Sequence, residues 1–321
     1  AEVISATTPL YILNNNQGAA VSDRGVYGRG LHLYSLIPSD DFVVGKSKTQ
    51  IQQIKDFETT GSGSYTRDIW ALHFVVIKRA NDIIRNVTDN DAISQKVKDF
   101  SLGQAYFMRG LAYFQLSVLY ADDTSGGIPI VDENVTEDFF IERPTSATTS
   151  YMFAAESFVK AAELLPYFDD SEYFAQGSDG LSPGTNLGRA HKNAALGYLA
   201  RTHLHNAQYD SSSWQKVIDA CNQVINSGKN QLESNFEDTF NHFSKNGYKV
   251  LIPELPLYTL PLIKTNVKNL AAFLKEFLEY KEIDNAILLG NSLGGHIALY
   301  FTKHYPEKVK ALVLTGSSGL Y

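Results

Sequence analysis

Hydrophobic residues recur at three- and four-residue spacing through most of the first 240 residues, which is the spacing of amphipathic helices. In the clearest stripe, one helical face is shared by Ile69, Leu72, Val76, Ala80 and Ile83. The same pattern predicts helices over 65–87, 93–120, 149–165, 189–207 and 213–227. Successive helices that bury aromatic and small residues are typical of tetratricopeptide (TPR) stacking, but no strict 34-residue repeat is visible, so periodicity alone predicts a bundle of helical pairs.

A different pattern begins near residue 240. Short apolar runs at 247–253, 286–289 and 311–314 predict buried strands, and the segment 266–280 has the pattern of an amphipathic helix. A further helix is predicted to end at about His304. This alternation of strand and helix indicates parallel strands joined by right-handed crossovers. The predicted inward side of 266–280 is formed by Val267, Leu270, Ala271, Leu274, Phe277 and Leu278.

These patterns predict a fold that is mainly α, with TPR-like helical pairs, for residues 1–240. An incomplete α/β parallel-sheet fragment is predicted to follow over 241–321. The charge distribution supports the same boundary. Residues 241–321 carry nine Lys, no Arg and six acidic residues, a balance of +3, whereas residues 1–240 have a balance of −10. We therefore expect two domains that meet near residue 240.

Composition excludes several classes of protein. Hydrophobic residues make up 44% and charged residues 20% of the chain, as in globular proteins. No apolar run approaches the roughly 18 residues that a transmembrane segment needs. The net charge of −7 and the lack of a basic block argue against nucleic acid as a partner. The chain begins at Ala1 without a Met, a leader or a lipid-attachment cysteine, so these residues do not indicate whether the protein is exported.

The single cysteine, Cys221, excludes an internal disulfide. Because Cys221 shares a helical face with Val217 and Val224, we expect a buried structural thiol. His203 and His205 are two residues apart on a helix and therefore point to different faces, which argues against a metal site. No metal or cofactor is predicted.

Several stretches of the first part resemble the SusD-like family. One is Asp68-Ile69-Trp70 followed by Ala80-Asn81-Asp82-Ile83-Ile84, and another is Gly126-Gly127-Ile128-Pro129. Similar stretches occur, in the family's order, at 103–114, 188–195 and 224–240. The resemblance covers roughly residues 10–240.

Members of the SusD-like family are surface lipoproteins of Gram-negative bacteria that hold glycans or other nutrients over a TonB-dependent outer-membrane transporter. They do no chemistry. The resemblance therefore implies a glycan or oligosaccharide ligand, a transporter partner and a surface-exposed position at the outer membrane. Because family members usually continue well past residue 240, it also implies a glycan-binding domain over 1–240 that is truncated at its C-terminal end.

Glycan binding has a plain physical basis. Aromatic rings stack on the C–H faces of pyranose rings, while amides and carboxylates bond the hydroxyl groups. Most aromatic residues here have a structural role instead, since helix cores are expected to hold Trp70, Phe74, Phe107 and Phe114. The glycan-binding residues are therefore left unassigned.

Gly290-Asn291-Ser292-Leu293-Gly294 lies between a predicted strand and a predicted helix. A Gly-x-Ser-x-Gly sequence in that context is the nucleophile elbow of the α/β-hydrolase fold, because its tight turn leaves no room for side chains beside the serine. With 305–314, this motif makes 241–321 resemble the middle of an α/β-hydrolase. Ser292 is then the candidate nucleophile, and the backbone N–H of Leu293 is a candidate oxyanion donor.

Serine catalysis also needs a histidine base, an acid that orients it and a second oxyanion donor. In this fold the acid and the histidine follow the serine, yet the groups that follow here are only His296, His304 and Glu307. His304 is twelve residues on, about 18 Å along a helix, and His296 belongs to the helix behind the elbow. Ser292 therefore occupies the position of a nucleophile, but we expect it to be inactive because the groups that would activate it are not in the expected places.

Three hypotheses remain open. The chain is a SusD-like glycan-binding protein with an inactive hydrolase fragment, or it is a serine hydrolase of esterase or lipase type with Ser292 as nucleophile. In the third, the chain joins two partial sequences and has no integrated activity. The sequence favours the first hypothesis for the family of the protein, because that resemblance covers most of the chain. It favours the third as the explanation of why two partial domains occur in one chain. Whether the chain is an enzyme is left uncertain.

Overall fold

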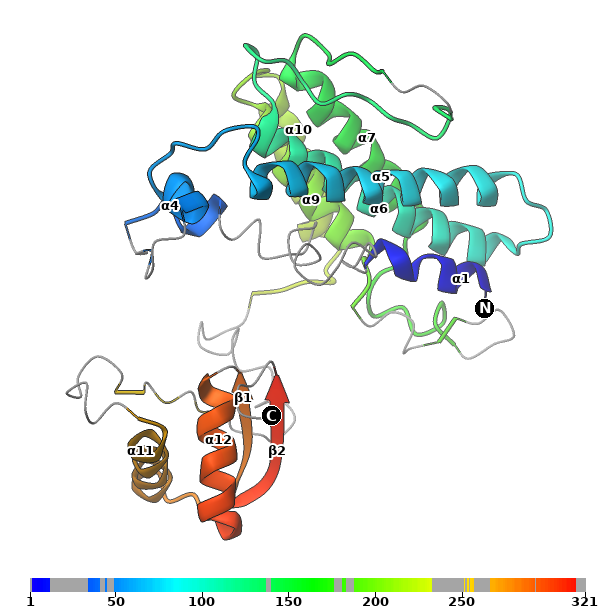
Figure 1. Cartoon of the computed structure of the whole chain (residues 1–321). Coiled ribbons are helices and arrows are strands. Elements are labelled where there is room, and N and C mark those ends of the chain that lie inside the picture. The colour runs from blue at the N-terminus through cyan, green and yellow to red at the C-terminus, as the bar shows by residue number, and fades with distance from the viewer. Residues whose placement is uncertain are drawn as a thin grey trace. The chain divides into compact units, whose positions relative to one another are not determined.

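The structure is a computed structural model that describes residues 2–11, 34–40, 44, 49–136, 140–175, 181–182, 188–232, 251, 253, 255–256, 266–291 and 293–315. The chain divides into two compact units, Ala1–Gln231 and Leu232–Tyr321 (Figure 1). The predicted domain boundary at residue 240 lies outside the described residues and stays a prediction.

The first unit is helical. Its elements are α1 (Glu2–Ala6), η1 (Thr8–Leu10), α4 (Thr49–Lys55), α5 (Ser64–Thr88), α6 (Gln95–Tyr120), α7 (Ala147–Leu164), α9 (Lys192–Asn206) and α10 (Ser213–Asn226). The five helices expected from the hydrophobic pattern are confirmed as α5, α6, α7, α9 and α10. Each packs on the next in that order, which is the arrangement expected of stacked helical pairs.

Helix α6 forms the centre of this unit. Most of its 26 residues are buried, and two of its glycines face close neighbours. A Cβ atom added to Gly103 would lie 2.7 Å from the Leu165 side chain. One added to Gly110 would lie 3.1 Å from the Phe158 ring, so small residues here let the helices approach closely.

The aromatic residues expected in the core are confirmed there. Phe107 and Phe114 are each 4% exposed. Trp70 and Phe74 are partly buried against the same core, with their ring centroids 5.1 Å apart. These rings are occupied by packing and are not free to stack on a ligand.

A buried arginine joins three helices to the loop after α6. Arg109 is 2% exposed, and its Nη1 donates to Glu133 Oε2 at 2.5 Å and to Asn81 Oδ1 at 3.0 Å. Its Nε donates to Ser157 Oγ at 3.2 Å. Burial by itself raises the pKa of Glu133, but the hydrogen bond and charge of Arg109 hold that pKa below its ordinary value. The buried charge is thus compensated on several sides.

The expected burial of Cys221 is wrong, because the cysteine is exposed. Helix α10 packs on α9, and its fully buried positions are Ser213 and Ala220. Cys221 is about 100° further around the helix than Ala220. Its exposed neighbours along that side include Trp214 and Ile218, at 54% and 52% exposure. The apolar pattern was wider than the face that α9 covers.

The second unit has a short α/β arrangement. Its elements are α11 (Val267–Tyr280), β1 (Ala286–Asn291), α12 (Leu293–His304), η5 (Pro306–Lys308) and β2 (Val309–Thr315). The strands pair in parallel, with Leu288 opposite Leu312. Helix α12 contacts both strands and α11 packs on α12, so the two helices lie on the same side of the sheet (Figure 1).

The predicted inward side of α11 is confirmed. Leu270, Ala271 and Leu278 are buried, and the other three predicted residues pack against the same cluster. The strand predicted over 247–253 is not confirmed at its described positions, since Leu251 and Pro253 belong to no strand. The rest of that segment lies outside the described residues.

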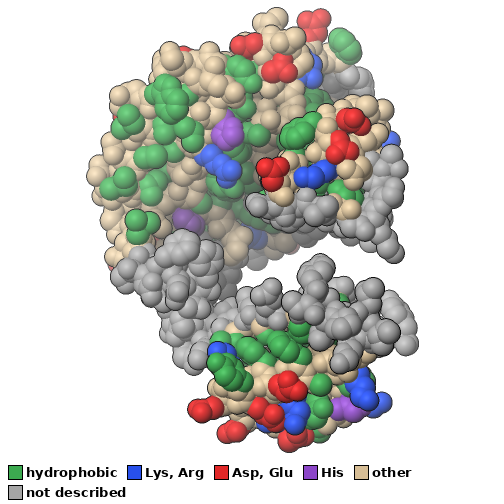
Figure 2. All heavy atoms as spheres, turned by 90° about the vertical axis from the view of Figure 1, so that its left-hand side faces the viewer, with side chains coloured by type: hydrophobic (Ala, Val, Ile, Leu, Met, Phe, Trp, Pro, Cys, Tyr) green, Lys and Arg blue, Asp and Glu red, His purple; other side chains and the backbone are tan. Residues whose placement is uncertain are grey.

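The surface of this unit carries charges of both signs. Lys275 and Lys308 both reach Glu279 Oε1, at 3.2 and 3.8 Å. Figure 2 shows acidic and basic side chains interspersed on the visible face of the unit. Ion pairing of this kind is expected for an exposed helix surface.

Candidate functional site

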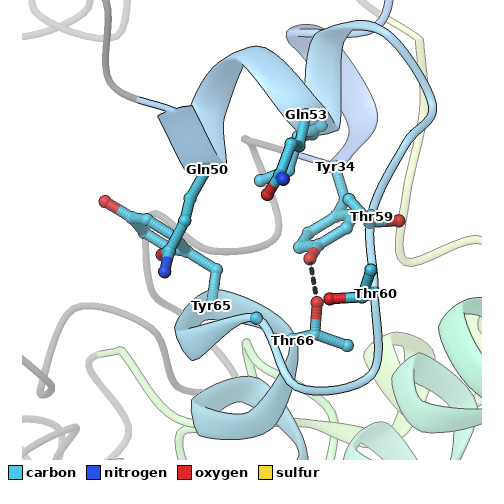
Figure 3. Close-up of a pocket in the computed structure, with 9 residues that line it drawn as sticks. Tyr34, Gln50, Gln53, Thr59, Thr60, Tyr65 and Thr66 are labelled. Carbon is cyan, nitrogen blue, oxygen red and sulfur yellow. Dashed lines mark hydrogen bonds between the residues drawn. The ribbon is translucent and has the colours of Figure 1, made fainter.

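A small pocket lies where α4 meets the start of α5 (Figure 3). Its cavity volume is only about 10 Å³, room for about one water molecule, and the rest of the hollow is open to solvent. Its lining is polar and aromatic, and consists of Tyr34, Gln50, Gln53, Ile54, Thr59, Thr60, Gly63, Tyr65 and Thr66. In Figure 3 the labelled side chains surround one space, although they come from separate segments of the chain.

Local hydrogen bonds hold these side chains. Gln50 and Gln53 lie three residues apart on α4, so their amides are on the same side of that helix. Ser64 Oγ donates to Gln50 Oε1 at 2.6 Å. The Tyr34 hydroxyl and Thr66 Oγ1 share a hydrogen bond of 2.6 Å, which is drawn in Figure 3.

Two polar groups of the pocket have no hydrogen-bond partner among the residues that the structure describes. No hydrogen bond joins the Gln53 side-chain amide, or Gln50 Nε2, to another described residue. Ile54 is 2% exposed and supplies an apolar base. None of the described residues that line the pocket carries a charge.

Sequence reasoning missed this pocket. One signal was present, since the small polar run 59–64 precedes the start of a long helix and follows two glutamines at helical spacing. The pocket also requires Tyr34, which is distant in sequence and whose position no local pattern predicts.

The nucleophile elbow is described only in part. Ser292 lies outside the described residues, between the end of β1 at Asn291 and the start of α12 at Leu293. A Cβ atom added to Gly290 would lie 2.6 Å from the carbonyl oxygen of Gly294. The turn is therefore as tight as the motif requires, and Leu293, 39% exposed, begins the following helix as predicted.

The three groups that the sequence analysis considered and rejected as partners of Ser292 lie within α12 or beyond it. His296 is half-buried within α12. His304 ends that helix, its Nδ1 lies 2.8 Å from the Tyr300 carbonyl oxygen, and its ring stacks on Tyr300 with centroids 4.0 Å apart. Glu307 lies in η5, beyond the helix. His304 and Glu307 are therefore not brought to the start of α12, whereas His296 lies within its first turn.

The two histidines of α9 have packing roles. His203 is 6% exposed, and burial lowers its pKa. The His205 ring meets the Phe114 ring edge-on at 5.2 Å. Over the described ranges, no group of three or more His, Cys, Asp or Glu residues is arranged to hold a metal ion. No described helix combines the length and apolar character needed to cross a bilayer.

Residues 29–204, more than half of the chain, match the family SusD-like_3, described as “Starch-binding associating with outer membrane”. The chain belongs to the SusD-like family. SusD-like protein P25 of Formosa agariphila is 25% identical over 250 residues, which cover 75% of this chain and 42% of that protein.

Solved structures of SusD-like proteins share the helical fold. A SusD homolog from Bacteroides thetaiotaomicron aligns with a TM-score of 0.57 at 20% identity, and covers 74% of this chain and 43% of its own. At this identity the likeness concerns the fold alone. The chain spans less than half the length of these two SusD-like relatives.

The second unit is similar to a different group. Residues 225–320 match the family described as “alpha/beta hydrolase fold”. The 2-hydroxy-6-oxo-6-phenylhexa-2,4-dienoate hydrolase of Burkholderia cepacia is 33% identical over 91 residues, which cover 27% of this chain and 32% of that enzyme. A SusD-like helical fold is thus followed by a partial α/β-hydrolase match, as both resemblances implied.

Proposed function

We propose that this protein binds glycans through its helical unit at the bacterial outer membrane. The observation that carries the proposal is the SusD-like match over residues 29–204, whose family is described as starch-binding. The proposed mode of action is capture without bond cleavage.

The proposal extends to partner and position. A SusD-like protein that captures glycan at the outer membrane would hand it to a TonB-dependent transporter, and would be lipid-anchored and exposed at the cell surface. Support for this step is the family's description as associating with the outer membrane. Co-purification of the transporter with the chain, expressed in a Bacteroides host, is the direct measurement.

We further infer that the hydrolase-like unit does not hydrolyse esters. The inference rests on the candidate partners of Ser292. His304 is at the opposite end of α12, with its ring stacked on Tyr300, and Glu307 lies beyond it. His296 is nearer, but it belongs to the helix that follows the elbow and not to a loop that faces the serine. A serine that no base activates is a weak nucleophile.

The alternative function is a serine hydrolase, and the similarity to the Burkholderia cepacia enzyme favours it. Purified chain and its Ser292→Ala variant are compared for turnover of p-nitrophenyl acetate and for labelling by a fluorophosphonate probe. We expect equal background turnover and no labelling. Turnover or labelling that disappears in Ser292→Ala would establish the alternative.

Glycan capture is tested by titrating the full chain with oligosaccharides and by retention on insoluble glycans. We expect binding to at least one glycan, unchanged by Ser292→Ala. Failure to bind any member of a broad neutral and acidic panel would refute the proposed function.

A further inference from the structure

We propose that two copies of this chain pair through helix α10, the last described helix of the first unit. The contact surface is the outer stripe of α10, which consists of Trp214, Ile218, Cys221 and Ile225. These positions recur at intervals of four, three and four residues, so they span only about 60° around the helix. Pairing of this kind does not depend on glycan binding.

The outer stripe is apolar and exposed to solvent. Ile225 is 68% exposed, and the other three residues of the stripe are exposed as well. Beside the stripe, Val217 and Val224 are half-buried, and Val224 packs against the core cluster around α6. The stripe is therefore the exposed continuation of the face that α10 turns toward α9. Single exposed hydrophobic residues are ordinary, whereas a contiguous apolar patch marks an interaction site.

The position of α10 in the stack indicates which kind of partner the stripe takes. An end helix of a stack normally has a polar outer face, because an apolar face is where the next helix packs. Helix α10 packs on α9 and carries the outer stripe on a side that α9 leaves open. The match to the alpha/beta hydrolase family begins at residue 225, in the last turn of α10, so the chain continues there in a different family. A second copy supplies the required helix, because it carries the same stripe.

The outer stripe is complementary to itself. In an antiparallel pair centred between Ile218 and Cys221, each of these two residues lies opposite the other residue of the second copy. The two charged residues of α10, Lys216 and Asp219, point more than about 100° away from the middle of the stripe. Two copies can therefore meet without burying a charge, which would be costly. A twofold contact of this type is the commonest form of subunit interface.

The length of α10 limits the strength of the pair. A helix of 14 residues is about 21 Å long. Pairing along one such helix stays below the roughly 1,200 Å² at which stable protein interfaces begin. We therefore expect a reversible dimer with a Kd on the order of 10–100 µM.

Sedimentation velocity of the full chain tests the pairing. It is run under reducing conditions from about 1 to about 300 µM, a range that includes the expected Kd. Ile218→Glu places a carboxylate at the centre of the contact and should weaken the dimer Kd about tenfold or more. Gln223→Glu is the matched control, because it adds the same charge to the exposed opposite side of α10 and should stay within about twofold.

Cys221 supplies a second, independent measurement. Its rate of alkylation by excess N-ethylmaleimide reports whether the stripe is covered. In the wild-type chain this rate should fall about threefold between the lowest and the highest protein concentration, because the thiol is covered in the dimer. In Ile218→Glu the rate should be the same at every concentration, and Gln223→Glu should behave as the wild-type chain does.

Thermal unfolding checks that each variant is folded. If Ile218→Glu does not fold, Trp214→Ser decides the outcome, since it removes the largest apolar side chain of the stripe and should also weaken the dimer.

Three results would overturn the proposal. The first is a chain that stays monomeric and whose Cys221 reacts equally fast at every concentration. The second is a monomer in which Cys221 reacts slowly throughout, which would mean that another part of the same chain covers the stripe. The third is a dimer that Ile218→Glu leaves intact, which would assign self-association to a different surface.

Discussion

Helix α6 and the β1–β2 sheet are the central elements of their units, and they differ in how far the described chain covers them. Most of the 26 residues of α6 are buried, because α5, α7 and α9 pack around it. The sheet is covered by α12 on one face, where Leu288 is 8% exposed. On the other face, Leu289 is 71% exposed. Parallel sheets are normally covered on both faces.

The difference reflects how each architecture is built. In a stack of helical pairs, each helix contacts its neighbours in sequence, so a portion of the stack closes its own core. In a parallel sheet, the two faces are covered by helices from separate crossovers, and one crossover supplies cover to one face only. A part of a helical stack therefore retains more of its fold than a part of an α/β sheet.

The largest effect is expected at Arg109, at the centre of the helical unit. Arg109→Leu leaves Glu133 and Asn81 without their shared partner and should cost about 3–5 kcal/mol in the free energy of unfolding, measured by urea titration. Arg67→Leu is the control, because that side chain is 67% exposed in its ion pair and should cost below about 0.5 kcal/mol. Equal costs for both variants would mean that the buried network contributes nothing.

The two faces of the sheet can be compared at adjacent residues. Leu288→Ala should destabilise the second unit by about 2–3 kcal/mol, because it opens a cavity under α12. Leu289→Ala removes the same atoms from the exposed face and should change stability by less than about 0.5 kcal/mol. Hydrogen exchange of the α12 amides reports both. A matching loss in Leu289→Ala would show that the outer face is also covered.

Acidification should weaken the helical unit through His73. This residue is fully buried, and burial lowers its pKa from the ordinary value of 6.5. Below that value the unfolded chain binds a proton that the folded chain does not, so stability falls as the pH drops from 6.5 toward the folded-state pKa. The slope from this group is at most about 1.4 kcal/mol per pH unit.

Urea titrations of unfolding at pH 7.5, 6.5 and 5.5 measure this slope. His73→Gln should flatten it, because the titrating group is gone. His304→Gln, at an exposed position of the other unit, is the control and should leave the slope of the helical unit unchanged. A slope that is the same in all three proteins would assign it to groups other than His73.

The smallest effect is expected at the surface. Lys78 is 76% exposed and pairs with Asp82 one turn away at 2.7 Å. Lys78→Ala should cost about 0.3–0.5 kcal/mol at low salt and less at high salt. Thermal unfolding at two salt concentrations gives both values. A loss above about 1 kcal/mol would mean that surface pairs, and not the core alone, set the stability of the helical unit.

Much of the fold follows from the sequence. The 3.6-residue period of apolar positions predicted α5, α6, α7, α9, α10 and α11, because each of these helices packs against a neighbour. Cys221 shows the limit of that signal. The apolar stripe of α10 is wider than its contact with α9, and periodicity does not tell which part of a stripe receives a neighbour.

The candidate site was far less predictable. The elbow could be located because its strand, turn and helix are consecutive in sequence, but Ser292 itself lies outside the described residues. The pocket brings Tyr34 to Thr66 across 32 positions. The buried network of Arg109 likewise reaches Ser157 across 48 positions. Such pairings depend on how helices stack, and no single segment encodes them.

The seven-residue helix α4 has a consequence for how this protein can diverge. Gln50 and Gln53 belong to the pocket, and neither belongs to the core cluster around α6. Substitutions at distant, independent sites are nearly additive. Gln50 and Gln53 can therefore be replaced while the packing around α6 is kept.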